Sequence, residues 1–213
     1  VINGTESAIN AALQGLSYTP NLNFIGSDTI TVRTSLSNGL ETLYTFDDGT
    51  ANDQAADSLN QNGTLTNGAS IVNDSQRGMV LNLDGVDDYI TATTAVPQSQ
   101  QNTLSAWIKP ISQIGVQEII ALGNDLNLRL NGTSLEAIYR NSSGSSWHTI
   151  SANLPSLAGQ WNHVAVTVDA VNHVQRLYLN GVQVAQQNFT AAQFFLSQPL
   201  RIGSNAGTPS LYY

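Results

Sequence analysis

The alternation of apolar and polar residues is clearest between residues 160 and 184. Three valines alternate with polar or small residues over 163–169, which is the two-residue period of a strand with one apolar face. A polar break follows, and a second alternating run spans 175–179. The pair Asn180-Gly181 comes directly after it, and Asn-Gly between alternating runs is the strongest short signal for a hairpin. The pattern predicts a meander of antiparallel strands.

The same alternation predicts short strands along most of the chain from residue 40 onward. Turn residues separate these runs at short intervals, and no long helical period interrupts them. Many short, evenly spaced strands are typical of an all-β, two-sheet antiparallel jelly-roll sandwich. The expected strands are Glu41–Phe46, Met79–Leu83, Tyr89–Thr91, Asn102–Ile108, Glu118–Leu122, Leu126–Leu130, Leu135–Tyr139, His148–Ala152, His163–Val168, Gln175–Leu179, Val182–Asn188 and Leu200–Ile202.

The tryptophans divide into two kinds. Trp107 and Trp161 fall within strand patterns, so both are expected to bury their rings between the two sheets. Trp147 follows a polar stretch, 141–146, and is a candidate platform for a sugar ring. The alternative, that Trp147 only anchors its loop, stays open.

Composition narrows the function classes. Charged residues make up only 10% of the 213 residues, and the formal net charge is −8. Because no basic stripe is available to neutralise phosphates, a nucleic-acid partner is not expected. The chain has no cysteine, which removes thiol nucleophiles and Cys-based zinc sites and favours a bacterial origin. No apolar run reaches membrane-spanning length, so membrane insertion is not expected either.

The first 37 residues differ in character from the rest. They hold a short helical patch at 8–13 and a strand-like run at 29–32, too little to bury a core alone. The stretches AINAALQGLSYTP (8–20) and NFIGSDTITV (23–32) resemble the closing half of bacterial cadherin-like repeats. This resemblance implies that residues 1–37 are the C-terminal part of such a repeat.

Residues 38–213 resemble a laminin-G-like jelly roll of the concanavalin-A superfamily, in its pentraxin-like bacterial branch. The motifs that carry the resemblance occur in order: LYTFDD (43–48), LNLDGVDDYI (81–90), TLSAWIKP (103–110), WNHVAVT (161–167), LYLNGV (177–182) and RIGSN (201–205). Such relatives usually close with a Phe-x-Gly-x-Ile-Asp strand that this sequence lacks. We therefore expect a missing closing strand, with an open edge that residues 1–37 cover or that causes self-association.

The resemblance also implies a calcium site, with Ca²⁺ as the candidate cofactor. Relatives often hold this ion at the rim of the sandwich, which points to Asp47, Asp57 and Asn60. Asp125 is a further candidate because its loop, 123–127, offers carboxylate and amide oxygens of the kind that Ca²⁺ prefers. The acidic group Asp84, Asp87 and Asp88 could also bind a cation, but we interpret it as a turn.

Some members of this superfamily are glycosidases, which require two carboxylates about 5–5.5 Å apart in the retaining mechanism. The glutamates are Glu6, Glu41, Glu118 and Glu136, and they appear isolated in the sequence. No Gly-x-Ser-x-Gly elbow is present. The sequence therefore predicts that the protein is not an enzyme.

The sequence predicts a non-catalytic binding module of a large bacterial surface or secreted protein, located outside the cell. It would recognise glycans or extracellular proteins in adhesion through Trp147, Tyr139, Asn141 and Asp125. Two alternatives stay open, a structural spacer of an adhesin stalk and a carbohydrate-targeting module of a multidomain hydrolase. Burial of both Trp147 and Tyr139, with no groove, would favour the spacer.

Overall fold

The computed structural model describes residues 39–55, 60–96, 100–140, 147–190, 198–205 and 213. The chain divides into two compact units, Val1–Thr34 and Ser35–Tyr213, and the described residues all belong to the second. The expected helical patch and the run at 29–32 lie outside them, as does the segment expected to cover an open edge.

The described residues form an all-β structure without helices, which confirms the predicted fold class. The strands are β1 (Gly63–Thr66), β2 (Ser70–Asp74), β3 (Gly78–Asn82), β4 (Tyr89–Val96), β5 (Gln101–Ile108), β6 (Val116–Leu122), β7 (Leu126–Asn131), β8 (Ser134–Arg140), β9 (Trp147–Asn153), β10 (Asn162–Asp169), β11 (Val174–Leu179), β12 (Val182–Asn188) and β13 (Gln198–Ile202). No helix in the described part is long and apolar enough to cross a membrane.

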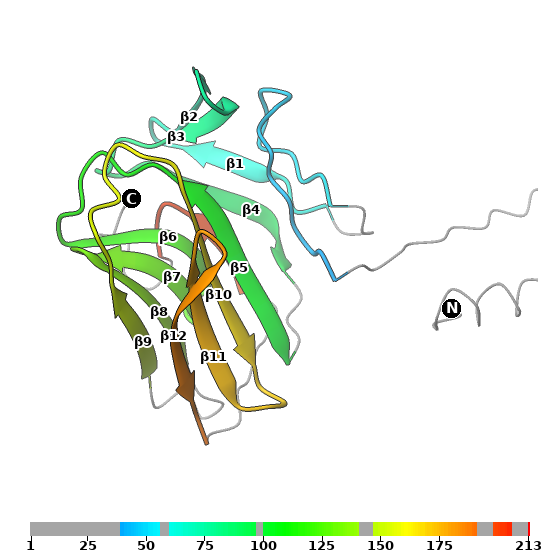
Figure 1. The fold of residues 1–213 in the computed structure, drawn as a ribbon. Helices are drawn as coiled ribbons and strands as arrows, with labels where there is room; N and C mark the ends of the chain where they lie inside the picture. Colours follow the sequence, from blue (N-terminus) through cyan, green and yellow to red (C-terminus); the bar gives the residue numbers. More distant parts are fainter. Residues whose placement is uncertain (1–38, 56–59, 97–99, 141–146, 191–197, 206–212) are drawn as a thin grey trace, which may run out of the picture. The chain divides into compact units, whose positions relative to one another are not determined.

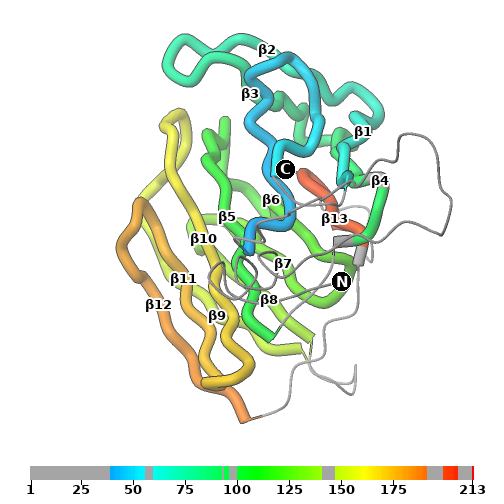
Figure 2. Tube along the Cα trace, turned by 90° about the vertical axis from the view of Figure 1, so that its right-hand side faces the viewer, coloured from blue at the N-terminus to red at the C-terminus, as the bar shows by residue number. Residues whose placement is uncertain are grey.

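The strands form two large antiparallel sheets and one hairpin (Figures 1 and 2). The larger sheet has the order β1-β4-β13-β6-β7-β8-β9, and the smaller has the order β12-β11-β10-β5. At one side of the sandwich β11 and β12 contact β9. The third sheet is the β2–β3 hairpin alone, which lies near one end of β5 and β10.

The core lies between the two large sheets. Leu126, Leu128 and Leu130 alternate along β7 and are fully buried, as are Val164 and Val166 on the facing β10. Burying each such side chain contributes about 1.5–3 kcal/mol relative to leaving it exposed. This period of two fixes which residues of every strand point away from the core. We call the surface of the larger sheet that points away from the smaller one its outer face.

The Asn180-Gly181 hairpin is confirmed. It joins β11 and β12, and both turn residues have positive φ, 49° for Asn180 and 81° for Gly181. Asn and Gly tolerate this backbone region, which is why the pair marks a tight turn between twisted strands. A bulge between Leu177 and Tyr178 then shifts the register of the hairpin.

The expected strand Glu41–Phe46 is wrong, and β1 and β2 were not expected. The segment follows an apolar alternation, but no strand pairs with it among the described residues. Its backbone is instead fixed locally: Leu43 N donates to Asp53 Oδ1 at 2.9 Å, and Gln54 N donates to the Leu43 carbonyl at 2.8 Å. Apolar alternation alone therefore does not make a segment a β-strand, because a strand also needs a neighbouring strand to hydrogen-bond with.

Candidate functional site

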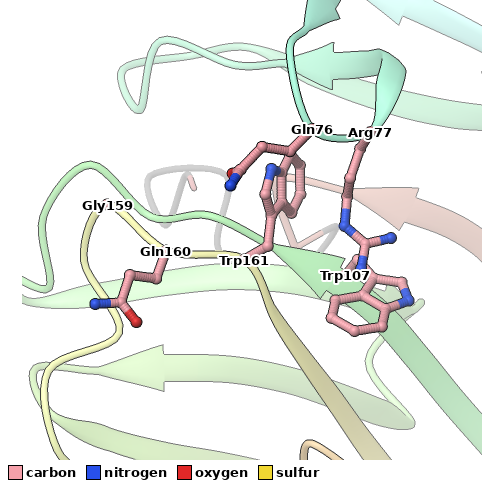
Figure 3. A pocket seen from close by; sticks show the side chains of 6 residues that line it. All are labelled: Gln76, Arg77, Trp107, Gly159, Gln160 and Trp161. Atoms are coloured by element: carbon pink, nitrogen blue, oxygen red, sulfur yellow. The ribbon is translucent and has the colours of Figure 1, made fainter.

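An open hollow of about 710 Å³ lies where the β2–β3 turn approaches β5 and the loop that enters β10 (Figure 3). This volume is within the range of about 300–1,000 Å³ typical of small-ligand sites. We call it the tryptophan groove. Its lining consists of Gln76, Arg77, Trp107, Gly159, Gln160 and Trp161.

Trp107 does not pack in the core, so the prediction of a buried ring is wrong. On β5 the alternate residues Leu104 and Ile108 face the core, which places Trp107 on the opposite side with half of its surface exposed. Its ring lies edge-on to that of His163, its cross-strand partner on β10, with the ring centroids 5.3 Å apart. An exposed tryptophan in a groove is free to contact a ligand.

Trp161 also differs from the prediction, because it comes just before β10 and packs toward the β2–β3 turn rather than between the sheets. Its Nε1 donates a hydrogen bond to Asp74 Oδ1 at 3.1 Å. The side chain is only partly buried. Trp107 and Trp161, the two tryptophans expected in the core, therefore both line the groove.

Arg77 joins the two rings. Its guanidinium carbon lies 3.4 Å from the centroid of the Trp107 ring and 5.3 Å from that of Trp161. Figure 3 shows the side chain extending from the β2–β3 turn down to Trp107. A guanidinium stacked on an indole in this way is a cation–π contact. Within the described part of the chain, the guanidinium forms no ion pair.

Asp74 holds the turn in place over the two strands. Its Oδ1 accepts hydrogen bonds from the backbone N of Gln76 at 2.9 Å and of Arg77 at 3.1 Å, besides that from Trp161. Its Oδ2 accepts from Lys109 Nζ at 3.0 Å. The backbone donor of Gln76 and then the Lys109 ammonium lower the pKa of Asp74 to about 2. The Asp74 carboxylate is therefore charged at every pH at which the protein would work.

The described residues predicted to bind ligand do not all point the same way, because Arg140 contacts both Trp147 and Asp125 whereas Tyr139 points to the opposite side of the sheet. Trp147 lies on the outer face at β9, more than half exposed, with Arg140 5.7 Å from its ring centroid. Tyr139 points the other way, into the core, where its ring stacks on His148 at a centroid distance of 4.8 Å. A ring that is 1% exposed offers no face to a sugar. Asn141 lies outside the described residues.

The candidate calcium ligands differ in their surroundings. Asp125 is buried and its Oδ1 pairs with Arg140 Nη2 at 2.9 Å, so that oxygen is already used inside the fold. Asp47 and Asn60 are exposed, and Asp57 lies outside the described residues. The calcium prediction for these residues stays a prediction.

Asp84, Asp87 and Asp88 bring carboxylate oxygens within 4.8 Å of one another, close enough to hold a cation. The same oxygens also stabilise a turn. Asp88 accepts from the backbone N of Gly68 at 2.6 Å and of Asp84 at 3.0 Å, and Asp84 accepts from Val86 N at 2.8 Å. Hydrogen bonds to Asp84 from the turn backbone lower its pKa.

A second polar cluster, unexpected from the sequence, lies in a row across β6, β7 and β8 on the outer face. Arg129 is the cross-strand partner of both Glu118 and Glu136. It donates to Glu136 Oε2 from Nη2 at 2.8 Å and from Nε at 3.0 Å, while Asn131 donates to Glu136 Oε1 at 3.1 Å. We call Glu118, Arg129 and Glu136 the Glu118 cluster.

Among the residues that the structure describes, Glu118 has no hydrogen-bond partner at either carboxylate oxygen, and its side chain has no exposed surface. Burial, with a smaller contribution from the Glu136 charge, raises the pKa of Glu118 to about 7, against the opposing pull of Arg129. The two glutamates that appeared isolated thus face one cation between them. Only the strand register, which places β7 between β6 and β8, could have revealed this.

The family follows from the fold and from a comparison of the sequence. Residues 84–212, more than half of the chain, match the model of the Concanavalin A-like lectin/glucanases superfamily. The chain therefore belongs to this superfamily, a laminin-G-type branch of it. Residues 1–45 match the model of the Protein GAMETE EXPRESSED 2 domain. The resemblance of residues 1–37 to a cadherin-like repeat stays a prediction. A comparison with curated proteins gave no match.

Solved structures share the fold at low identity. Domain 4 of AbnA, a GH43 extracellular arabinanase from Geobacillus stearothermophilus solved with arabinotriose, is 21% identical with a TM-score of 0.60, over 81% of this chain and 86% of that chain. The receptor-binding domain of botulinum neurotoxin mosaic serotype C/D is 15% identical with a TM-score of 0.58, over 73% and 40%. The serotype D ligand-binding domain in complex with N-acetylneuraminic acid is 14% identical with a TM-score of 0.55, over 71% and 39%. The chain thus spans about two fifths of the neurotoxin chains.

Proposed function

We propose that this protein is a glycan-binding module and that the tryptophan groove is its ligand site. The observation that carries the proposal is the half-exposed Trp107 ring in an open hollow with Trp161 and Arg77. Ligand sites combine apolar, mostly aromatic walls with a few polar groups that set orientation. Here Gln76 places its amide beside the Trp161 ring, and Gln160 adds a second amide to the lining on the side away from Trp107 (Figure 3).

Structural neighbours support the choice of ligand class. AbnA domain 4 was solved with arabinotriose, and a neurotoxin domain of the same fold was solved with N-acetylneuraminic acid. The exposed groove also weakens the spacer alternative, because a spacer needs no concave aromatic surface. A glycan is therefore our first expectation, ahead of an extracellular protein.

We infer binding without catalysis. The lining of the groove contains no carboxylate. Asp74 beneath it is fully engaged by its four donors. The glutamates of the Glu118 cluster flank Arg129 from β6 and β8, but Glu118 is shut off from solvent and Glu136 is held by Arg129. A retaining glycosidase needs two carboxylates that reach the substrate.

The proposed setting is extracellular, within a larger bacterial surface or secreted protein. The acidic, cysteine-free composition suits this setting. The likeness to AbnA domain 4, one domain of an arabinanase, favours a second candidate role as the carbohydrate-targeting module of a hydrolase. Adhesion and assistance by Ca²⁺ are further proposals.

Titration calorimetry of the purified chain against a panel of plant and animal oligosaccharides tests the proposal, with and without Ca²⁺. We expect Trp107→Ala to weaken saccharide binding at least about tenfold, the equivalent of about 1.4 kcal/mol of lost ring contact. The fold should survive, because half of the ring is already in solvent.

The matched control is Trp147→Ala, which removes the other exposed tryptophan and should leave affinity unchanged. Two results would contradict the proposal. One is a panel without any bound saccharide. The other is binding that depends on Trp147 and not on Trp107.

A further inference from the structure

We infer that the tryptophan groove selects acidic saccharides, those that carry a carboxylate or a sulfate, and that Arg77 is the residue that pairs with the anionic group. The inference rests on the proposed function, since it concerns the ligand class of the same groove. It is carried by the charge balance around Arg77 and by the way the side chain is held.

Arg77 lacks the carboxylate partner that some other basic side chains of the described residues have. Three basic side chains of the described residues are paired with carboxylates: Lys109 with Asp74, Arg129 with Glu136 and Arg140 with Asp125. Arg77 has no such partner within the described part of the chain. Lys109 and Arg77 together carry two positive charges against the single negative charge of Asp74. A local positive charge thus remains in a chain whose formal net charge is −8.

The side chain of Arg77 is held in position at both ends. The turn that carries Arg77 is fixed by Asp74, which binds the backbone of Gln76 and Arg77 and the side chains of Lys109 and Trp161. The guanidinium itself is held 3.4 Å from the Trp107 ring centroid. Its donors are therefore oriented before a ligand arrives, which reduces the entropy lost on binding.

Acidic and neutral ligands can contact the guanidinium of Arg77 in different ways. The guanidinium covers one side of the Trp107 ring, so a neutral sugar must displace Arg77 to stack there. An anionic group can instead accept two parallel hydrogen bonds from the planar guanidinium while Arg77 stays in place. The formal net charge of −8 does not prevent this, because exposed charges farther apart than about 8 Å are largely screened at physiological salt.

The test uses matched ligand pairs with the intact chain. One pair is an oligogalacturonate and its methyl ester, and the other is a sulfated glycan and its desulfated form. We expect at least about tenfold tighter binding of the acidic member in calorimetry at physiological salt, the gain of a charge-assisted bond. The two pairs distinguish a carboxylate from a sulfate as the recognised group.

The variants Arg77→Gln and Arg77→Lys identify the responsible residue. Arg77→Gln should abolish the preference for the acidic member, and Arg77→Lys should retain only part of it because an ammonium lacks the planar fork. Arg176→Gln is the control, since Arg176 lies on β11 and bonds Gln186 rather than the groove. It should leave the preference unchanged.

The outcomes separate this inference from the proposed function. Binding of neutral saccharides that requires Trp107, with no preference for the acidic members, would overturn the inference and leave the glycan-binding proposal standing. An acidic preference that persists in Arg77→Gln would also overturn it. Absence of any saccharide binding would overturn both.

Discussion

The groove and the outer face of the larger sheet both hold ion pairs, and each also holds an ionisable group that joins no ion pair among the described residues: Arg77 in the groove and Glu118 on the outer face. In the groove, Arg77 and Lys109 outnumber Asp74, and the extra charge is a guanidinium beside an open hollow. On the outer face Arg129 pairs with Glu136 and Arg140 pairs with Asp125. Arg201, which alternates with the core-facing Leu200 and Ile202 on β13, lies over the ring of Tyr89. Glu118 belongs to neither of these ion pairs, and its carboxyl is fully buried.

Burial decides what the unmatched group can do. A buried carboxyl without hydrogen bonds is cheaper to keep protonated than charged, so Glu118 responds by a raised pKa. An arginine side chain stays charged at any pH at which a protein is folded. The guanidinium of Arg77 can therefore be stabilised only by stacking on an aromatic ring or by binding an external anion. We therefore expect ligand recognition in the groove and a contribution to stability from the outer face.

The largest expected effect comes from removing the cation of the Glu118 cluster. Arg129→Met leaves Glu136 without its ion pair and removes the positive charge that opposes the raised pKa of Glu118. We expect a loss of about 3–5 kcal/mol in the free energy of unfolding, measured by urea denaturation at pH 7.5, as for other broken buried pairs. Saccharide affinity of the folded fraction should not change.

The double variant Arg129→Met/Glu136→Gln is the control for this effect. It should recover part of the lost stability, because the uncompensated charge of Glu136 is gone. A single variant as stable as the wild type would show that the pair contributes nothing, and the distinction between the two regions would fail.

A somewhat smaller effect is expected from the titration of Glu118. Its pKa in the folded state, about 7, lies above the ordinary value of 4.5, so the folded state binds more protons than the unfolded state between these values. The contribution of Glu118 is therefore intact below about pH 4.5 and is lost as the pH rises through 7. At about 1.4 kcal/mol per pH unit, the loss amounts to roughly 3 kcal/mol by pH 8.5.

Urea denaturation of wild type and Glu118→Gln at a series of pH values measures this contribution. The difference between the two proteins isolates Glu118, because all other groups titrate in both. We expect the variant to gain stability relative to the wild type as the pH rises from 5 to 8.5. A pH-independent difference would mean that Glu118 is hydrated or paired in solution.

Strand periods predicted most of the sandwich but not its site. Alternation on β5 and β10 correctly located both strands, and the Asn180-Gly181 turn followed from residue chemistry alone. The same alternation states that Trp107 shares a face with Ser105 and not with Leu104, which indicates an outward ring. The size of a tryptophan favours a buried ring, but the position of Trp107 in the alternation of β5 places it outward, and the structure follows the alternation.

The remaining parts of both regions depend on contacts between distant residues. Asp74 reaches Lys109 35 positions away and Trp161 87 positions away. Glu118 and Glu136 lie on either side of Arg129 only because β7 is placed between their strands. Nothing in the local sequence encodes these pairings, since they follow from sheet order and register. Tyr139, in contrast, is buried because of its position in the alternation of β8, which points its side chain into the core.

The smallest expected effect on stability, and one confined to the groove, comes from Asp74. Asp74→Asn keeps the shape of the side chain but removes the charge that attracts Lys109 and weakens the acceptor for Trp161 and the turn. The β2–β3 turn should then hold Arg77 less firmly over Trp107, so that binding must order both. We expect saccharide affinity to fall about tenfold, a cost of the size associated with ordering an immobilised side chain or losing a charged hydrogen bond.

Two measurements check the role of Asp74. Hydrogen exchange should report faster opening of the β2–β3 hairpin in Asp74→Asn, with β6 to β8 unchanged, and calorimetry should report the weaker binding. Because the pKa of Asp74 is about 2, wild-type affinity should not change between pH 5 and pH 8 on account of this carboxylate. If Asp74→Asn loosens the hairpin and leaves affinity intact, then Arg77 does not need a fixed turn to recognise its ligand, and preorganisation is not what makes the groove a binding site.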